Sequence, residues 1–272
     1  MRVGFVHSTT PQEKPGGAQY HVFDLMGAAP DNVAPIWCLP GKWERNCDAY
    51  VVADPTGSPV TDVKWLIDDC RAPKLRLVMG YEGVPRSDVD PLNASMRAIV
   101  FKSPLHQAVY AQMYPLPQGP LVGCLPPPMD VQAVMASNGS PERKGIAWAG
   151  AWESRNGMDI IMKWAREHKS YVDMVGMGLK HGEGGEWWSL QGQAPDRETV
   201  WRFMAAHKAF VHMPRWPSPF GIAAMEAYAT GCDLILSGRI GATSYGEPPS
   251  AVLGRCARAT SDFWKLVDEV TS

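Results

Sequence analysis

The stretch "PSPFGIAAMEAYATGCDLILS", residues 217–237, predicts a helix that ends at Gly231 and leads directly into a buried strand. The helix begins near Phe220, which places Gly221 where unpaired backbone N–H groups create an anion site. Glu226 is the single acid in this otherwise small and apolar helix. A carboxylate above small residues can accept two hydrogen bonds from a vicinal diol, as acidic side chains do with ribose. The same pattern leaves open a solvated glutamate on an amphipathic helix.

Length and composition limit the class of protein. The chain of 272 residues is long enough for two α/β domains, each with a core of ordinary size. Its 26 basic and 28 acidic residues nearly balance, which argues against the overall positive field of a protein that binds bare nucleic acid. The balance is still compatible with a local basic patch. The six cysteines form no C-x-x-C pair, as is typical of reduced thiols in a cytoplasmic protein. No segment approaches the about 20 apolar residues of a membrane span, so we expect a soluble protein.

Short β-rich runs alternate with helical patterns along the chain, which predicts βαβ units, parallel sheets and an α/β fold. The predicted strands lie at 2–7, 34–40, 49–53, 75–80, 97–102, 120–125, 145–151, 171–177, 186–193, 209–213 and 233–237. A stretch rich in Pro, Ser, Asn and Gly indicates a connection between two domains. We expect an N-terminal domain over 1–127, a linker over 128–145, a C-terminal domain over 146–256, and a C-terminal helix over 257–272 that could pack on either domain.

The quoted stretch resembles the donor-binding signature of family 4 glycosyltransferases, E-P-F-G-x-x-x-x-E-A-x-x-x-G-x-P-V-x-x-S. The residues in register with it are Phe220, Gly221, Glu226, Ala227, Gly231 and Ser237. Three further fragments are similar to motifs of the family in the same order: "GGAQYHVFDL" at 16–25, "LPPPMD" at 125–130 and "AGAWESRNGMD" at 149–159. "YVDMVGMG" at 171–178 then fits the strand and glycine turn that follow.

The resemblance implies the GT-B fold, in which two Rossmann-like domains face each other across a cleft. It implies a hexosyl- or pentosyltransferase that moves a sugar from a nucleotide-sugar, such as a UDP- or GDP-sugar, to a hydroxyl acceptor on the N-terminal side, with retention of configuration and without a metal. Glu226 would hold the ribose and the Gly221 helix start would face the diphosphate. The donor-binding candidates are Gly16, Gly17, Gly150, Asn156, Leu190, Gln191, Arg215, Phe220, Gly221 and Glu226.

The chain departs from the family pattern at its charged positions. Ser218 stands in place of the first glutamate of the motif, and Ala151 and Asn156 stand in place of the arginine and lysine that neutralise the phosphates. Because a departing diphosphate needs positive charge, we expect a substitute, of which Arg155 is the nearest. Further substitutes are Lys144 and Arg215, and ordinary surface charge is the competing interpretation for all three.

The catalytic candidates are Arg155, Ser218 and His7. His7 ends the first strand, where it could contact the acceptor or the sugar, or serve as a structural histidine. The pair Asp88 and Asp90 is a weaker candidate for a metal site, and "KHGEGG" at 180–185 indicates a mobile glycine loop. The stripe formed by Trp201, Met204 and Ala205 is typical of a helix face that packs on the core.

The sequence leaves the acceptor open. Compact enzymes of this fold occur in bacteriophages, where some glycosylate hydroxymethylated bases in DNA, and this is our first alternative. Trp187, Trp188 and Arg155 could supply stacking and charge to such an acceptor. The second alternative is an inactive protein that binds nucleotide-sugars, as the missing charged positions would allow.

Overall fold

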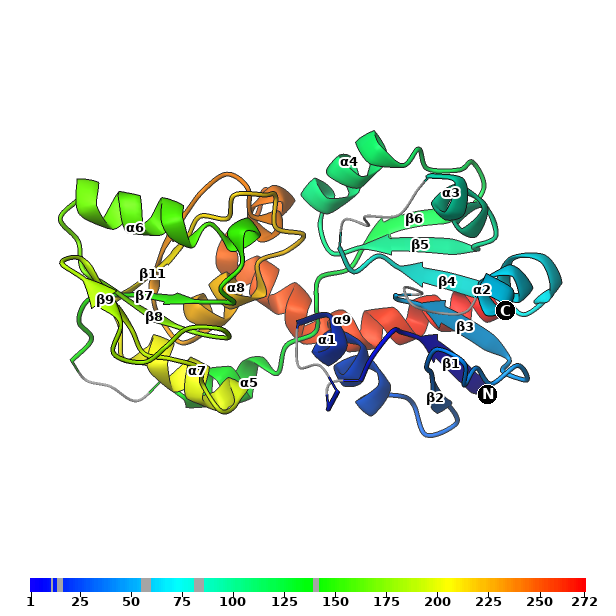
Figure 1. Cartoon of the computed structure of the whole chain (residues 1–272). Helices are drawn as coiled ribbons and strands as arrows, with labels where there is room; N and C mark the ends of the chain where they lie inside the picture. The colour runs from blue at the N-terminus through cyan, green and yellow to red at the C-terminus, as the bar shows by residue number, and fades with distance from the viewer. Residues whose placement is uncertain (11, 14–16, 55–59, 81–85, 139–141) are drawn as a thin grey trace. The chain divides into compact units, whose positions relative to one another are not determined.

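A computed structural model describes residues 1–10, 12–13, 17–54, 60–80, 86–138 and 142–272 (Figure 1). The chain divides into two compact units: one comprises Met1–Pro128 and Arg255–Ser272, and the other comprises Met129–Gly254. Each unit contains one six-stranded sheet. In the parts of the chain that the structure describes, no helix is long and apolar enough to cross a membrane.

The sheet of the first unit is parallel throughout, with the strand order β2-β1-β3-β4-β5-β6. Its strands are β1 (Arg2–Val6), β2 (Ala34–Cys38), β3 (Ala49–Val52), β4 (Lys74–Leu77), β5 (Ala98–Phe101) and β6 (Leu121–Cys124). The helices of this unit are α1 (Gly17–Gly27), α2 (Val60–Lys64) with the π-helical turn Trp65–Asp69, α3 (Arg86–Ala94), α4 (Pro104–Met113) and most of α9 (Pro249–Thr271). Neighbouring strand residues alternate between two apolar clusters, so both faces of the sheet are covered, as a parallel sheet requires.

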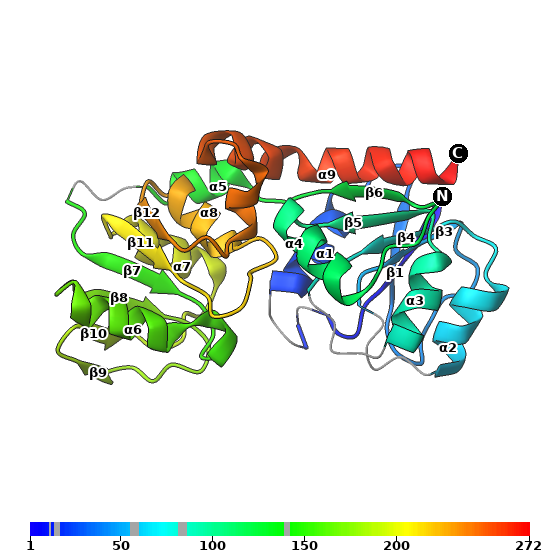
Figure 2. The same ribbon diagram turned by 90° about the horizontal axis from the view of Figure 1, so that it is seen from above.

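Helix α9 completes one face of the first sheet (Figure 2). The side chains of Phe263, Trp264 and Val267 are buried in the same cluster as Phe5 of β1. The indole nitrogen Nε1 of Trp264 also donates a hydrogen bond to the Leu25 carbonyl oxygen at 3.0 Å. The helix starts at Pro249, earlier than the expected range of 257–272, because proline is well tolerated in the first turn of a helix.

The sheet of the second unit has the order β12-β11-β7-β8-β10-β9, and only the short β9 runs antiparallel to its neighbour. Its strands are β7 (Ile146–Ala149), β8 (Val172–Val175), β9 (Gly184–Gly185), β10 (Trp188–Leu190), β11 (Ala209–His212) and β12 (Asp233–Leu236). Its helices are α5 (Val131–Ala136), α6 (Met158–Glu167), α7 (Arg197–Ala205) and α8 (Ile222–Ala229), with 3-10 turns at Ser154–Asn156 and Gly241–Tyr245.

Two segments differ in detail from the sequence-based expectation. The range 128–145, expected as a linker, contains helix α5, which packs against α8 and is capped by the Asp130 carboxylate accepting from the Ala133 N–H at 3.0 Å. The helix has only six residues, and its proline- and serine-rich flanks dominate the composition of the segment, so the sequence pattern did not predict it. The glycine loop expected at 180–185 includes strand β9, which pairs with β10.

Replacing Trp264 with alanine tests the role of α9. We expect Trp264→Ala to lower the free energy of unfolding by about 3 to 5 kcal/mol, because a large buried side chain and its hydrogen bond are lost. Urea unfolding followed by circular dichroism measures this. Lys265→Ala is the matched control, since its side chain is 78% exposed and its loss should change stability by less than about 0.5 kcal/mol. Equal unfolding midpoints for the two variants would contradict the packing of α9 described here.

Candidate functional site

Four loops at the carboxyl ends of the strands in the second unit form the candidate site. The loop after β11 joins the loop after β7 through the Arg215 N–H, which donates to the Arg155 carbonyl at 3.0 Å. The loop after β7 joins the loop after β8 through a 2.8 Å bond from the Trp152 N–H to the Met177 carbonyl. The loop after β12 pairs with the loop after β11, where the Ser218 N–H donates to the Arg239 carbonyl at 2.8 Å. Ligands of open α/β sheets bind at this carboxyl edge.

We call these four loops, which follow β7, β8, β11 and β12, the rim. The start of helix α8 lies within the rim and is open to an anion. Gly221 precedes the helix with φ of +83°, a conformation that favours glycine, and it provides no side-chain cap. A Cβ atom at this position would lie 2.7 Å from Cγ2 of Ile240. In the first turn of α8 the Ala224 N–H donates to the Gly221 carbonyl at 3.0 Å. The N–H groups of Ile222 and Ala223 have no carbonyl partner among the described residues, so they are available to a bound anion.

The carboxylate of Glu226 is buried on α8, with 6% of the residue exposed. Its Oε1 atom accepts hydrogen bonds from Nε of Arg197 at 2.7 Å and from Nε1 of Trp201 at 3.0 Å. The alternative of a solvated glutamate is therefore wrong. Both bonds use one oxygen, and among the described residues none donates to Oε2, which retains its capacity to accept hydrogen bonds from a ligand.

Arg197 and Trp201 are site residues that the sequence analysis missed. They lie one turn apart on α7, and the Arg197 guanidinium is 5.3 Å from the centre of the Trp201 ring. Trp201 was expected on a core-facing stripe, and its stripe neighbours Met204 and Ala205 are indeed buried. The spacing of Arg197 and Trp201 by four residues was the available signal, but nothing local to α7 reveals the carboxylate on α8 that they share.

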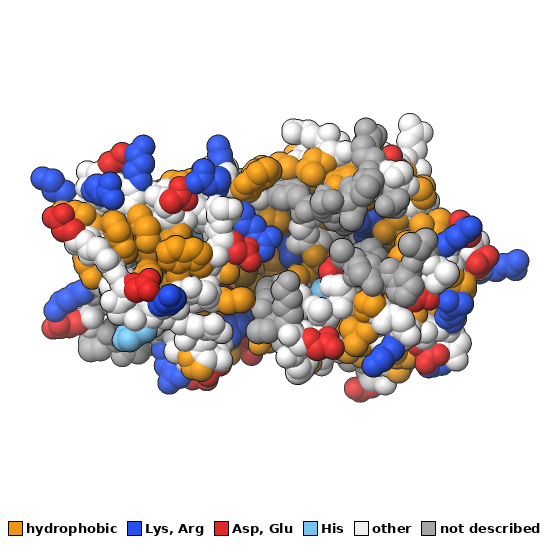
Figure 3. All heavy atoms as spheres, viewed as in Figure 1, with side chains coloured by type: hydrophobic (Ala, Val, Ile, Leu, Met, Phe, Trp, Pro, Cys, Tyr) orange, Lys and Arg blue, Asp and Glu red, His pale blue; other side chains and the backbone are white. Residues whose placement is uncertain are grey.

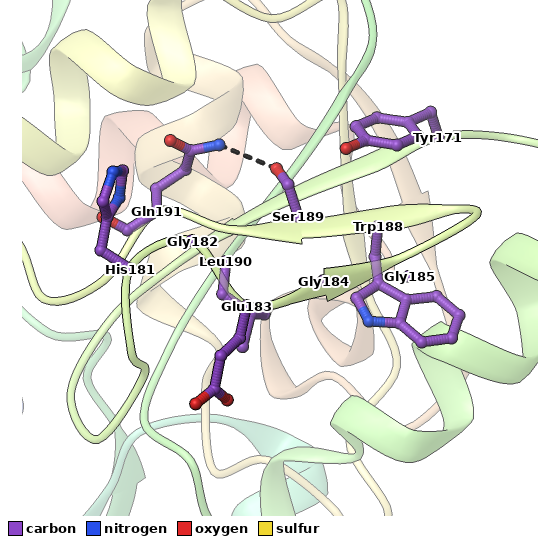
Figure 4. Close-up of a pocket in the computed structure, with 10 residues that line it drawn as sticks. All are labelled: Tyr171, His181, Gly182, Glu183, Gly184, Gly185, Trp188, Ser189, Leu190 and Gln191. Atoms are coloured by element: carbon purple, nitrogen blue, oxygen red, sulfur yellow. Dashed lines mark hydrogen bonds between the residues drawn. The ribbon is translucent and has the colours of Figure 1, made fainter.

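The residues expected near the base, Leu190 and Gln191, lie at the end of β10 (Figure 4). The Leu190 side chain is buried in the core, whereas the Gln191 side chain is exposed. Nε2 of Gln191 donates to Oγ of Ser189 at 2.8 Å and to Oδ1 of Asp173 at 3.1 Å. These residues border a shallow hollow of about 440 Å³, in which Gln191 and Ser189 lie on one side of the β9–β10 hairpin and Glu183 on the other.

The three arginines of the rim differ in their partners. Arg155 forms an ion pair with Glu153, and Arg215 forms one with Asp159. Arg239 instead donates from Nη1 to the backbone carbonyl of Arg215.

Other predicted positions have structural contacts of their own. Nδ2 of Asn156 donates to the Ala151 carbonyl at 2.8 Å and closes the turn. The Gly150 N–H donates to the Val175 carbonyl at 3.1 Å. The Phe220 side chain is buried with its ring edge-on to Tyr245. Lys144, a candidate substitute cation, forms an exposed ion pair with Glu142.

A buried histidine, His212, lies beneath the start of α8 and was not singled out from the sequence. It ends β11, and its Cδ2 atom lies 3.7 Å from the Cβ that Gly221 would carry. Burial lowers the pKa of His212 to about 4, so the ring is neutral at physiological pH. Within the described residues its Nδ1 atom has no hydrogen-bond partner.

In the first unit the structure describes two of the three predicted residues, since Gly16 lies outside the described ranges. Gly17 is the first residue of α1. His7 is fully buried at the end of β1, where Nδ1 accepts from the Thr9 N–H at 3.2 Å and the ring lies edge-on to Trp37. Burial lowers the pKa of His7, and the nearby Asp54 carboxylate partly opposes this shift.

Among the described residues, no group of three or more His, Cys, Asp or Glu side chains could hold a metal ion. The weaker metal candidate, Asp88 with Asp90, includes the Asp88 side chain, which lies outside the described atoms.

Comparison with solved structures identifies the fold. HepE of Anabaena in complex with UDP-glucose matches with a TM-score of 0.68 at 14% identity, over 100% of this chain and 92% of that chain. An alpha-glucosyltransferase in complex with UDP and a 13-mer DNA containing an HMU base matches with a TM-score of 0.62 at 11% identity, over 100% and 93%. AviGT4, a glycosyltransferase involved in avilamycin A biosynthesis, matches with a TM-score of 0.61 at 14% identity, over 100% and 97%. No protein-family model and no curated protein matches the sequence.

The protein therefore has the GT-B fold, as the sequence resemblance implied.

The buried His212 predicts an acid-sensitive stability. A folded-state pKa near 4, below the usual value of 6.5, means that the unfolded chain binds a proton between these pH values that the folded chain does not. Stability should therefore fall as the pH drops from about 6.5 to 4. In His212→Gln this fall should be smaller by about 3 kcal/mol, measured as urea unfolding free energies at pH 7 and pH 4. An equal fall in both proteins would rule out the neutral, buried state of this ring.

Proposed function

We propose that the protein is a glycosyltransferase that moves a hexosyl or pentosyl group from a nucleotide-sugar to a hydroxyl acceptor, with retention of configuration and without a metal. The observation that carries this proposal is the buried Glu226 carboxylate on the helix whose start is open to an anion, in a chain with the GT-B fold. Two of the solved structures reported above contain UDP-glucose or UDP, which supports a uridine nucleotide as the first donor to test.

The spacing on α8 suits a nucleoside diphosphate. Glu226 follows Gly221 by five residues, which corresponds to about 7.5 Å along a helix axis. A nucleoside diphosphate separates its ribose hydroxyls from its phosphates on this same length scale. Oε2 of Glu226 would accept from the ribose, while the first-turn amides of α8 would face the diphosphate.

The chemistry asked of the protein is the stabilisation of a departing diphosphate. Negative charge grows on the phosphate oxygens as the bond to the sugar breaks, and fixed N–H dipoles lower the energy of that state. The arginine-bearing loops of the rim would add positive charge beside the α8 start. Ser218 would offer a hydroxyl to the donor sugar, and Gln191 would lie near the base.

We also propose a cytoplasmic location. All six cysteines are free, and five of them are buried, as is common for thiols in a reducing compartment.

A panel of nucleotide-sugars tests the reaction. An active enzyme should release free nucleotide from one donor without acceptor, whereas an inactive binding protein would be thermally stabilised by that donor without release. If no UDP- or GDP-sugar causes either thermal stabilisation or nucleotide release, both interpretations are refuted.

Within this proposal, Glu226→Ala should weaken nucleotide binding by about 1 to 3 kcal/mol, because an acceptor for the ribose hydroxyls is lost. Isothermal titration calorimetry with UDP and GDP measures the change. Glu198→Gln on the exposed face of α7 is the control and should bind like the wild type. An unchanged affinity in Glu226→Ala would remove this residue from the site.

DNA is the second candidate acceptor, and two exposed indoles favour it. Trp216 and Trp152 are 64% and 52% exposed on rim loops that also carry arginines. Exposed aromatic rings beside cations form stacking platforms for unpaired bases. The solved alpha-glucosyltransferase with a bound DNA 13-mer supports the same acceptor class. Against it, acidic and basic side chains intermingle on the face seen in Figure 3, in line with the near-neutral net charge.

If the acceptor is DNA, Trp216→Ala should weaken binding of a single-stranded oligonucleotide by about 1 to 3 kcal/mol through lost stacking. Fluorescence anisotropy at several salt concentrations measures this, and affinity should fall steeply as salt rises. Tyr171→Ala is the control, because Tyr171 is also exposed, at 47%, but precedes β8 at the amino end of that strand and lies outside the rim loops. Equal losses in the two variants, or no DNA binding by the wild type, would exclude this acceptor.

A further inference from the structure

We propose that Arg239 is the residue that contacts the diphosphate of the donor and stabilises its departure, an inference that rests on the proposed function. The family resemblance places phosphate-binding cations at positions occupied here by Ala151 and Asn156, neither of which is charged. Asn156 also uses its amide to close its own turn. The positive charge must therefore come from elsewhere on the rim.

The backbone places Arg239 beside the start of α8. Residues 239–242 run alongside residues 218–220, joined by bonds from the Ser218 N–H to the Arg239 carbonyl at 2.8 Å and from the Gly241 N–H to the Ser218 carbonyl at 3.0 Å. A third bond joins the Ala242 N–H to the Phe220 carbonyl at 2.8 Å. Ile240, the next residue after Arg239, packs so close to Gly221 that a Cβ atom there would overlap its side chain. The loop of Arg239 is thus built against the anion-binding helix start.

The charge of Arg239 distinguishes it from its two neighbours. Arg155 and Arg215 each face a carboxylate, of Glu153 and of Asp159, which offsets part of their attraction for a phosphate. In the described part of the chain, the guanidinium of Arg239 has no acidic partner, and its one hydrogen bond runs from Nη1 to the Arg215 carbonyl.

That bond holds the guanidinium against the loop and engages one of its two terminal nitrogens. A guanidinium has five N–H donors in a planar fork, so the donors on Nη2 and Nε can bind phosphate oxygens. The residue is exposed, which leaves it accessible to a ligand at this edge.

The role follows from the electron movement of the transfer. The bond between the sugar C1 and the β-phosphate oxygen breaks, and its electron pair stays on the diphosphate. The acceptor oxygen forms the new bond to C1, and the acceptor proton passes to a phosphate oxygen. Arg239 would offset the charge that develops on the diphosphate, while the α8 amides act from the other side.

The experiment compares nucleoside diphosphates with their nucleosides. UDP and uridine, with GDP and guanosine alongside, are titrated calorimetrically into the wild type and Arg239→Gln. We expect the affinity for the diphosphate to fall 10- to 100-fold while the affinity for the nucleoside stays unchanged. If Arg239 had a purely structural role, its replacement would lower the affinities for the diphosphate and the nucleoside together. Arg239→Lys should restore part of the diphosphate affinity, and the rate of donor hydrolysis should follow the same order.

Arg202→Gln is the matched control, because it removes an exposed arginine of α7 that is paired with Glu198 and to which no role in the site is assigned. The inference is overturned if Arg239→Gln leaves the ratio of diphosphate to nucleoside affinity unchanged, or if Arg202→Gln reproduces the full loss. Failure of the wild type to bind any nucleoside diphosphate would overturn the proposed function itself, and the inference with it. The two failures are therefore distinct.

Discussion

The second unit is organised around one buried negative charge. A carboxylate removed from water requires hydrogen-bond donors and a cation, and Glu226 obtains them from Arg197 and Trp201. This requirement ties α7 to α8. Alanines on α8, including Ala224 and Ala227, are buried against the sheet and let the helix pack closely. One carboxylate oxygen carries both bonds, which leaves the other as an acceptor beside an open helix start.

The parallel sheet of the second unit explains why its candidate functional groups gather at one edge. All its long strands run in the same direction, so the loops that follow β7, β8, β11 and β12 emerge side by side and bond to one another. The rim therefore combines backbone donors at Gly221, arginine side chains and exposed tryptophans. The buried His212 below it is neutral because burial lowers its pKa, so this histidine adds no positive charge to the rim.

Periodicity was sufficient to predict the α/β class and the helix that carries Glu226, and the resemblance to a known family implied the GT-B fold. They could not predict the partners of Glu226, because Arg197 and Trp201 are 29 and 25 residues away in sequence and meet it only after α7 and α8 have packed. Short helices such as α5 were missed, since six residues give too little periodicity. Arg239 was missed because its significance depends on loop pairing, which leaves no pattern in the sequence.

The central claim is that Glu226 binds the ribose hydroxyls of a nucleotide. The most direct measurement is a cycle in which UDP and 2′,3′-dideoxy-UDP are each titrated into the wild type and Glu226→Ala. The account predicts that the wild type binds 2′,3′-dideoxy-UDP more weakly than UDP. It also predicts that the wild type and Glu226→Ala bind 2′,3′-dideoxy-UDP with the same affinity. If removing the hydroxyls lowers the affinity of the wild type and of Glu226→Ala by the same factor, the carboxylate and the ribose do not interact. That result would contradict the account.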